Sequence, residues 1–274
     1  MVGAGLYHLV SAALSPRASS LSRGALPRFA AAGPLARRRG AGCRIPAGSG
    51  FAARLCGRRG GAAMTPEMVA QARALTPGCT AHAHLNNAGA ALMPTPVLEA
   101  QIEHLRLEAA LGGYEAAHAA ADRVARPRHA LAKLLHGHAD DMVLCDSATS
   151  AWRIGLEALD LASGQEVLIS RTVYASNFMT LRRLVERRGV RLRVVESDPT
   201  GQLSLAGLRA AIGPHTRLIA MAHMPTNSGL VNPVAEVGAI AQAAGVPFLL
   251  DACQTVGQLE IDVREIGCDL LSGT

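Results

Sequence analysis

The chain has 274 residues, of which 49% are hydrophobic and 3% are aromatic, and its formal net charge is +6. This length allows a large core in one or two domains. No uncharged apolar run is long enough to span a bilayer, so we expect a soluble protein with no membrane partner. The scarcity of aromatic residues argues against a nucleic-acid partner, whose binding surface combines clustered basic residues with stacking aromatics.

The positive charge is confined to the N-terminal stretch. Residues 1–66 contain ten arginines and no acidic residue, so the rest of the chain carries a net charge of −4. We interpret residues 1–63 as a leader, either a transit peptide or a disordered segment, because it is rich in Arg, Ala and Gly. A transit peptide would direct the protein to mitochondria or plastids. The alternative is an over-extended start and a cytoplasmic protein, because Met64 opens a natural-looking helix start with Thr65 as cap and Pro66 in the first turn.

Residues 64–274 form the folded domain that the sequence predicts, and beyond Pro94 they alternate between helical and strand-like segments. The helical segments are 97–111, 123–136, 150–161, 177–188, 205–212 and 234–244. Runs rich in Val, Ile and Leu lie between them, at 142–145, 166–170, 191–196, 217–223 and 246–251. Strands that alternate with helices at this spacing indicate βαβ units. We therefore predict an α/β fold with a three-layer, doubly wound, mostly parallel sheet.

Polar strings follow the predicted strands, at the sheet edge where doubly wound folds bind ligands. They read DSATSAW (146–152), SRTVYASN (170–177), AHMPTNSG (222–229) and DACQT (251–255). No GxGxxG or Walker pattern follows a strand, which argues against a nucleotide-binding domain. The six cysteines contain no CxxC pair, and the two HxH pairs have no third ligand nearby, so no metal site is predicted.

These strings occur in the same order as the cofactor motifs of the class V aminotransferase and cysteine desulfurase-like family of pyridoxal phosphate enzymes (fold type I), and they resemble them. Asp251 and Gln254 match the family's D-x-x-Q. In the family this aspartate faces the pyridine nitrogen and keeps it protonated, and the glutamine lies near the phenolic oxygen. The resemblance covers residues 84–274 and implies pyridoxal 5'-phosphate as cofactor, with these roles for Asp251 and Gln254.

Two further motifs concern the cofactor phosphate and ring. Ala148, Thr149 and Ser150 open a helix directly after a strand, which resembles the family's phosphate-binding turn. Tyr174 holds the position of the residue that stacks on the cofactor ring, where many desulfurases have His. The resemblance therefore places these four residues at the cofactor, and the Tyr weakens a desulfurase assignment because that His carries protons.

Two more segments extend the resemblance beyond the cofactor ring. Thr226 stands where desulfurases usually have Asn, inside a loop that resembles the family's H-V-x-x-x-x-G-x-x-N-P. The string HLNNAGAALMP (84–94) resembles the family's opening segment, which implies that Asn87, Ala88 and Gly89 lie on the substrate side. GGYEAA (112–117) resembles a loop that contacts a neighbouring subunit, so we expect a homodimer in the full-length form.

The family holds its cofactor through a lysine that follows a strand ending in Ser-Gly. CDLLSGT (268–274) resembles that strand and implies that Ser272 lies near the phosphate, so the expected lysine falls beyond Thr274. Lys133, the single lysine, lies in a helical stretch ahead of the phosphate turn, and we interpret it as a surface residue. The family's small C-terminal domain is also missing, so we expect a truncated chain that is inactive as given.

The resemblance implies an enzyme that acts on an amino-acid substrate through an external aldimine. Transamination and desulfurase, lyase or epimerase chemistry all begin this way, so the cofactor residues do not distinguish them. The alternative is a non-catalytic remnant that binds pyridoxal phosphate weakly or only pairs with another subunit.

Overall fold

The computed structural model describes residues 10–14 and 65–274, so the predicted leader lies outside the described residues except for 10–14. The chain divides into two units, Met1–Ala25 with His104–Thr274, and Leu26–Glu103. The described part of the second unit contains α1 (Pro66–Ala74), α2 (Gly78–Ala81) and the start of α3 (Thr95–Leu111). Among residues 10–14 and 65–274, no helix combines the length and apolar character that a membrane crossing requires.

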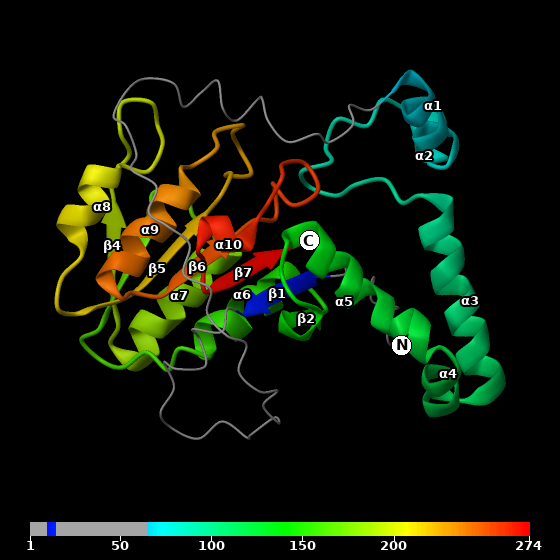
Figure 1. Cartoon of the computed structure of the whole chain (residues 1–274), viewed down its shortest axis with the longest axis horizontal. Helices are drawn as coiled ribbons and strands as arrows, with labels where there is room; N and C mark the ends of the chain where they lie inside the picture. The colour runs from blue at the N-terminus through cyan, green and yellow to red at the C-terminus, as the bar shows by residue number, and fades with distance from the viewer. Residues whose placement is uncertain (1–9, 15–64) are drawn as a thin grey trace, which may run out of the picture. The chain divides into compact units, whose positions relative to one another are not determined.

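The first unit is built on a seven-stranded sheet with strand order β2-β1-β7-β6-β5-β3-β4 (Figure 1). Its strands are β1 (Val10–Leu14), β2 (Met142–Cys145), β3 (Glu166–Ser170), β4 (Arg191–Val195), β5 (Thr216–Ala222), β6 (Phe248–Asp251) and β7 (Leu270–Gly273). The five strands from β3 to β7 are parallel, whereas β1 pairs antiparallel with both β2 and β7. The mostly parallel sheet is confirmed. The sequence did not predict β1, because its five residues lie within the Arg/Ala/Gly-rich leader.

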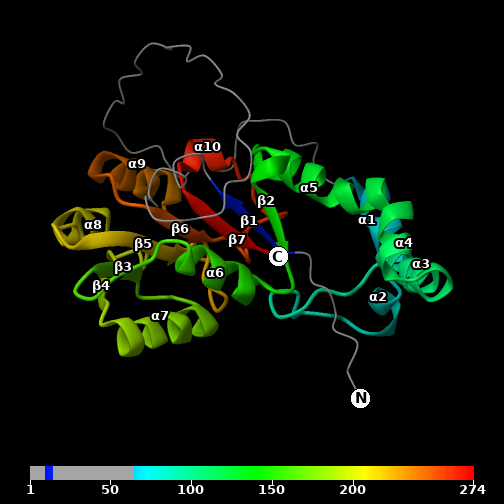
Figure 2. The same cartoon turned by 90° about the horizontal axis from the view of Figure 1, so that it is seen from below.

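Helices cover both faces of the sheet (Figure 2). One face is covered by α6 (Ala148–Glu157) and α7 (Ala175–Arg188), whose Trp152, Leu156 and Leu181 pack on Val167 and Leu249. The other face carries α5 (Ala121–Leu135), α8 (Leu205–Ala211), α9 (Val234–Ala244) and α10 (Val263–Ile266). The remaining short helices are α4 (Gly113–Ala119) and η2 (Ala139–Asp141). Each face buries its own apolar cluster, so the three-layer prediction is confirmed.

Most predicted helices keep their positions, and the caps explain where they end. Gly189 and Gly245 follow α7 and α9 with φ of 68° and 66°, the left-handed conformation that ends a helix at low steric cost. The helix predicted at 150–161 instead begins at Ala148 and ends at Glu157. Asp160 then adopts a φ of 41°, which breaks the helical backbone before Leu161 packs into the core.

The backbone of α9 lies very close to the backbone at the end of α10. A Cβ atom added to Gly238 would overlap the carbonyl oxygen of Ile266 and lie 3.0 Å from its carbonyl carbon. Backbone atoms cannot turn aside as a flexible side chain can. Glycine at position 238 therefore sets the spacing between these two helices.

We expect Gly238→Ala to lower the free energy of unfolding by about 1–3 kcal/mol, the usual cost of overpacking a core. Urea unfolding followed by circular dichroism measures this change. Gly213→Ala is the matched control, because a Cβ atom at Gly213 meets nothing within 4 Å. Equal effects of the two substitutions would contradict the proposed packing constraint.

Candidate functional site

The strands β5, β6 and β7 end side by side, and their last residues include a buried carboxylate. In the sheet register Ala222 pairs with Asp251, and Asp251 pairs with Ser272. Asp251 is 6% exposed and Ser272 is 1% exposed. Side chains alternate along a strand, and Leu249 and Leu270 belong to the cluster beneath α6 and α7. Asp251 and Ser272 therefore lie on the face that α6 and α7 cover.

The predicted phosphate turn forms the start of α6, immediately after β2. Ser147 is the N-cap residue, and its Oγ accepts a hydrogen bond from the N–H of Ser150 at 3.1 Å. The N–H groups of Ala148 and Thr149 lie in the first turn, where no acceptor exists within the helix. Of the three predicted residues, Ser150 already donates its N–H to the cap residue Ser147. The N–H groups of Ala148 and Thr149 remain available to a ligand at the N-terminal end of α6. Ser147 was not among the residues predicted for the phosphate turn, although a Ser before a helical run is a recognisable cap signal.

The start of α7 lies beside the start of α6. The hydroxyl oxygens of Thr149 and Ser176 are 3.0 Å apart. Tyr174 is the N-cap residue of α7, makes no side-chain cap bond and is half exposed. Two helix N-termini therefore meet here, with an exposed Thr149 and a half-buried Ser176, an arrangement that favours a bound anion such as a phosphate group.

Two nitrogen donors orient the Asp251 carboxylate. Its Oδ2 accepts from Asn177 Nδ2 on α7 at 2.7 Å, and its Oδ1 accepts from the Cys253 N–H at 3.1 Å. Within residues 65–274 no ion pair includes Asp251. A buried carboxylate normally pairs with a cation, so this one is arranged to attract a positively charged ligand group.

Cys253 follows Asp251 and is not prepared to act as a nucleophile. Burial, the neighbouring Asp251 charge and a hydrogen bond with that carboxylate all raise the pKa of the Cys253 thiol. A thiol must lose its proton to attack, so Cys253 stays unreactive near neutral pH.

Hydrogen bonds of the motif residues His223 and Asn232 hold the loop after β5 in place. Asn232 Oδ1 accepts from the Leu203 N–H and its Nδ2 donates to the Ala222 carbonyl, both at 2.9 Å. His223 Nδ1 lies 3.0 Å from Thr255 Oγ1, and both side chains are buried. These residues therefore hold the loop in place and join it to the segment after β6.

The remaining predicted residues have different surroundings. Thr226 is exposed on the loop after β5, and Gln254 is half-buried three residues after Asp251. Ser272 Oγ is buried and makes no hydrogen bond in the described part of the chain. Asn87, Ala88 and Gly89 belong to the other unit, so their place on the substrate side stays a prediction.

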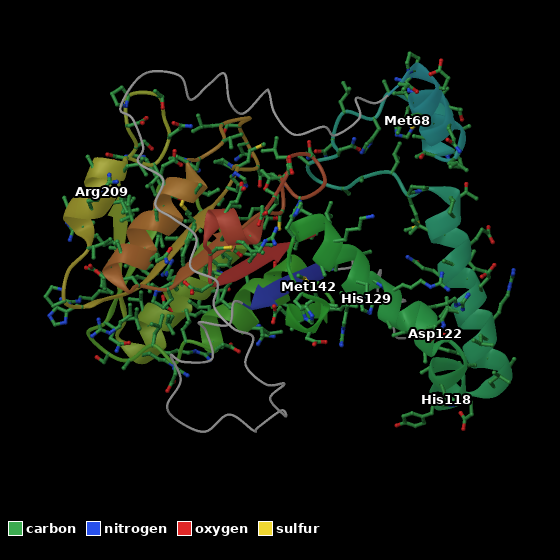
Figure 3. The ribbon with its side chains drawn as sticks, in the orientation of Figure 1. Met68, His118, Asp122, His129, Met142 and Arg209 are labelled. Atoms are coloured by element: carbon green, nitrogen blue, oxygen red, sulfur yellow. The ribbon has the colours of Figure 1, made fainter. Side chains whose placement is uncertain are left out.

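Lys133 lies exposed on α5, as predicted, and α5 packs on the face opposite α6 and α7. The same face carries a cavity of about 420 Å³ between α8 and α9, and Arg209, labelled in Figure 3, contributes to its lining. Neither feature shares a face with Asp251. In the described ranges 10–14 and 65–274, no three His, Cys, Asp or Glu residues gather closely enough to hold a metal ion.

Comparisons with known proteins show the family to which the chain belongs. The family model named Aminotransferase class-V matches residues 83–273. A "Probable cysteine desulfurase" of Methanothermobacter thermautotrophicus is 31% identical over 191 residues, which are 69% of this chain and 48% of the relative. "Cysteine desulfurase IscS" of Anaeromyxobacter sp. is 30% identical over 64% of this chain and 45% of its own length. The chain belongs to the aminotransferase class-V family.

Solved structures give the same assignment. A C-DES mutant with glycine covalently linked to the PLP cofactor is 26% identical with a TM-score of 0.68, covering 74% of this chain and 55% of that chain. The cystine C-S lyase C-DES in complex with cysteine persulfide is 25% identical with a TM-score of 0.68, covering 73% of this chain and 54% of that chain. The resemblance stated from the sequence is therefore confirmed. The chain spans about half the length of the curated relatives it matches.

Burial lowers the pKa of His223 from 6.5 to about 4. Between these two pH values His223 is protonated in the unfolded chain and neutral in the folded chain. The free energy of unfolding therefore decreases as the pH falls from about 7 to 4. We expect His223 to account for a loss of about 3 kcal/mol of unfolding free energy over this range.

Urea unfolding at a series of pH values measures this dependence, and His223→Gln should flatten it. His215→Gln, at an exposed histidine beside the same strand, is the control and should leave the dependence unchanged. If the His223 variant kept the full pH dependence, the protonation assigned to His223 would be wrong.

Proposed function

We propose that this chain forms the cofactor-binding part of a pyridoxal phosphate enzyme that acts on an amino-acid substrate. The cofactor supported by the family and by the solved relative is pyridoxal 5'-phosphate. The observation that carries the proposal is the buried Asp251 carboxylate, which is held by nitrogen donors and lies in no ion pair of residues 65–274. A protonated pyridine nitrogen is the cation that would complete it.

The residues present fit the two ends of this cofactor. Asp251 would hold the ring nitrogen, and its negative charge would keep that nitrogen protonated. The N–H groups of Ala148 and Thr149, with the Thr149 hydroxyl, would hold the phosphate at the start of α6. Ser272 Oγ is buried beside Asp251 in the sheet register and makes no hydrogen bond in the described part of the chain, so it has a donor and an acceptor available for a ligand. When bound, the cofactor supplies an electron sink for carbanion chemistry.

The reaction of the whole protein is proposed only as a class. Transamination and desulfurase, lyase or epimerase chemistry on an amino acid all fit these cofactor residues. The relatives named cysteine desulfurase and cystine C-S lyase favour substrates with a C–S bond. Tyr174 stands where many desulfurases have their proton-carrying His, so we infer a different proton carrier in this protein.

A second candidate is a non-catalytic unit that holds the cofactor without a covalent bond or only pairs with another subunit. Within these 274 residues, Lys133 is exposed on the face opposite Asp251, so it would not attach the cofactor at this site. We also propose that the full-length form is a homodimer. Tyr114, on α4 within the predicted subunit-contact loop, is 92% exposed, which suits a residue that a second subunit covers.

We expect Asp251→Asn to weaken the binding of pyridoxal phosphate to the 274-residue chain about 10-fold or more, because an amide cannot compensate the charge of the ring nitrogen. Quenching of the single tryptophan, Trp152 on α6, measures the affinity. Asp140→Asn, at an exposed carboxylate after α5, is the matched control. A wild-type chain that does not bind the cofactor would refute the proposed function, and an Asp251→Asn affinity equal to that of the wild type would refute the role of Asp251.

We expect borohydride treatment of the 274-residue chain with pyridoxal phosphate to modify Lys133 only as an exposed surface amine, in proportion to the reagent concentration and without saturation at the affinity of the site, because Lys133 lies on the opposite face. Peptide mass spectrometry detects attachment at this residue. Lys133→Arg should leave the cofactor affinity unchanged, and neither form should turn over an amino-acid substrate. Attachment to Lys133 that saturates at the affinity measured by Trp152 fluorescence, together with a loss of that affinity in the Lys133→Arg chain, would contradict the assigned site.

A further inference from the structure

Asn177 is an unusual residue for its place in α7. Asparagine is a weak helix former, and its amide is costly to bury without partners. Yet Asn177 lies near the start of a 14-residue helix and is only 3% exposed. Its Nδ2 donates to Asp251 Oδ2 at 2.7 Å, across 74 residues of sequence. The buried amide therefore has a definite use, which is to hold the carboxylate at the end of β6.

This hydrogen bond decides how the carboxylate can be oriented. The Cys253 N–H holds Oδ1 from the backbone that follows Asp251, so it fixes one oxygen only. The bond from Asn177 holds the second oxygen from a different element. Because the amide is neutral, it orients the carboxylate without cancelling its charge. The negative charge thus stays available for a ligand cation.

The first turn of α7 also reaches the other end of the site. Ser176 precedes Asn177, and its hydroxyl lies 3.0 Å from that of Thr149 in the predicted phosphate turn. Two consecutive residues of α7 therefore contact both the carboxylate and the turn. This arrangement fixes the position of Asp251 relative to the start of α6.

We propose that Asn177 is a positioning residue that orients the Asp251 carboxylate toward the ring nitrogen of pyridoxal phosphate. The inference rests on the proposed cofactor site and adds a residue that acts through Asp251. Its effect should depend on the ring nitrogen, because Asp251 interacts with that atom. A cofactor analogue in which carbon replaces the ring nitrogen, 1-deazapyridoxal 5'-phosphate, separates this effect from a general loss of structure.

The experiment compares the affinities of the 274-residue chain and its Asn177→Leu variant for pyridoxal phosphate and for the deaza analogue. Trp152 fluorescence reports binding without any need for turnover. We expect the wild-type chain to prefer pyridoxal phosphate. The variant should bind pyridoxal phosphate about 10-fold more weakly and bind the analogue nearly as well as the wild type does.

The matched control is Leu181→Ala, one turn further along α7. Leu181 is fully buried and packs in the cluster beneath α6 and α7, so its truncation lowers stability without removing the Asn177 hydrogen bond. Thermal unfolding of all variants ranks their stability. Leu181→Ala should leave the ratio of the two affinities unchanged.

A second variant and a measurement on the wild-type chain extend the test to the case in which Asn177→Leu does not fold. Asn177→Ser keeps a small polar side chain that is too short for the same bond, and it should reduce the preference for pyridoxal phosphate. In the wild-type chain, the ¹⁵N resonance of the Asn177 side chain should shift on binding pyridoxal phosphate and much less on binding the analogue.

The outcomes separate the two proposals. A wild-type chain that binds neither compound would overturn the cofactor site itself. A wild-type chain that prefers pyridoxal phosphate, with an Asn177 variant that keeps the full preference or loses both affinities equally, would overturn the positioning role alone. Equal shifts of the Asn177 resonance with both compounds would do the same.

Discussion

The contact between Asn177 and Asp251 is the interaction on which the geometry of the site depends. A buried carboxylate is expensive unless it is hydrogen-bonded, and here an amide from α7 and a backbone N–H meet that need. A cationic partner would have satisfied the carboxylate and also neutralised it. The neutral donors leave a negative charge at the carboxyl end of the sheet, which attracts a positive ligand group, whereas the helix N-termini nearby favour a negative ligand group. The site therefore suits a molecule that is positive at one end and negative at the other, as pyridoxal phosphate is.

In the loop after β5, some residues of the family motif stabilise the fold by contacts within the protein. His223 and Asn232 match the motif in the sequence, but in the structure they bind other parts of the protein. Asn232 bridges the end of β5 and Leu203, and His223 reaches Thr255 after β6. Their side-chain hydrogen bonds add to the backbone bonds from the His223 N–H to the Asp251 carbonyl and from the Asn232 N–H to the His223 carbonyl. The exposed Thr226 is thereby carried on a loop whose base is fixed.

Local patterns in the sequence were sufficient to predict the alternating elements and the polar strand ends, because period and composition act over a few residues. They located Asp251 directly after an apolar run. They did not predict the role of Asn177, since its partner lies 74 residues away. The strand at Val10–Leu14 escaped prediction because its flanking composition indicates a leader. Pairings between distant segments depend on how the chain folds as a whole, and no local pattern encodes them.

The isolated position of Lys133 has a practical consequence. A chain with one lysine, exposed on α5, offers amine-reactive reagents a single side-chain target besides the α-amino group. A dye or a surface linker attached there would occupy the α5 face and leave the α6 and α7 face accessible. With the α-amino group blocked, the chain can therefore be immobilised or labelled in one defined orientation that leaves Asp251 and its surroundings uncovered.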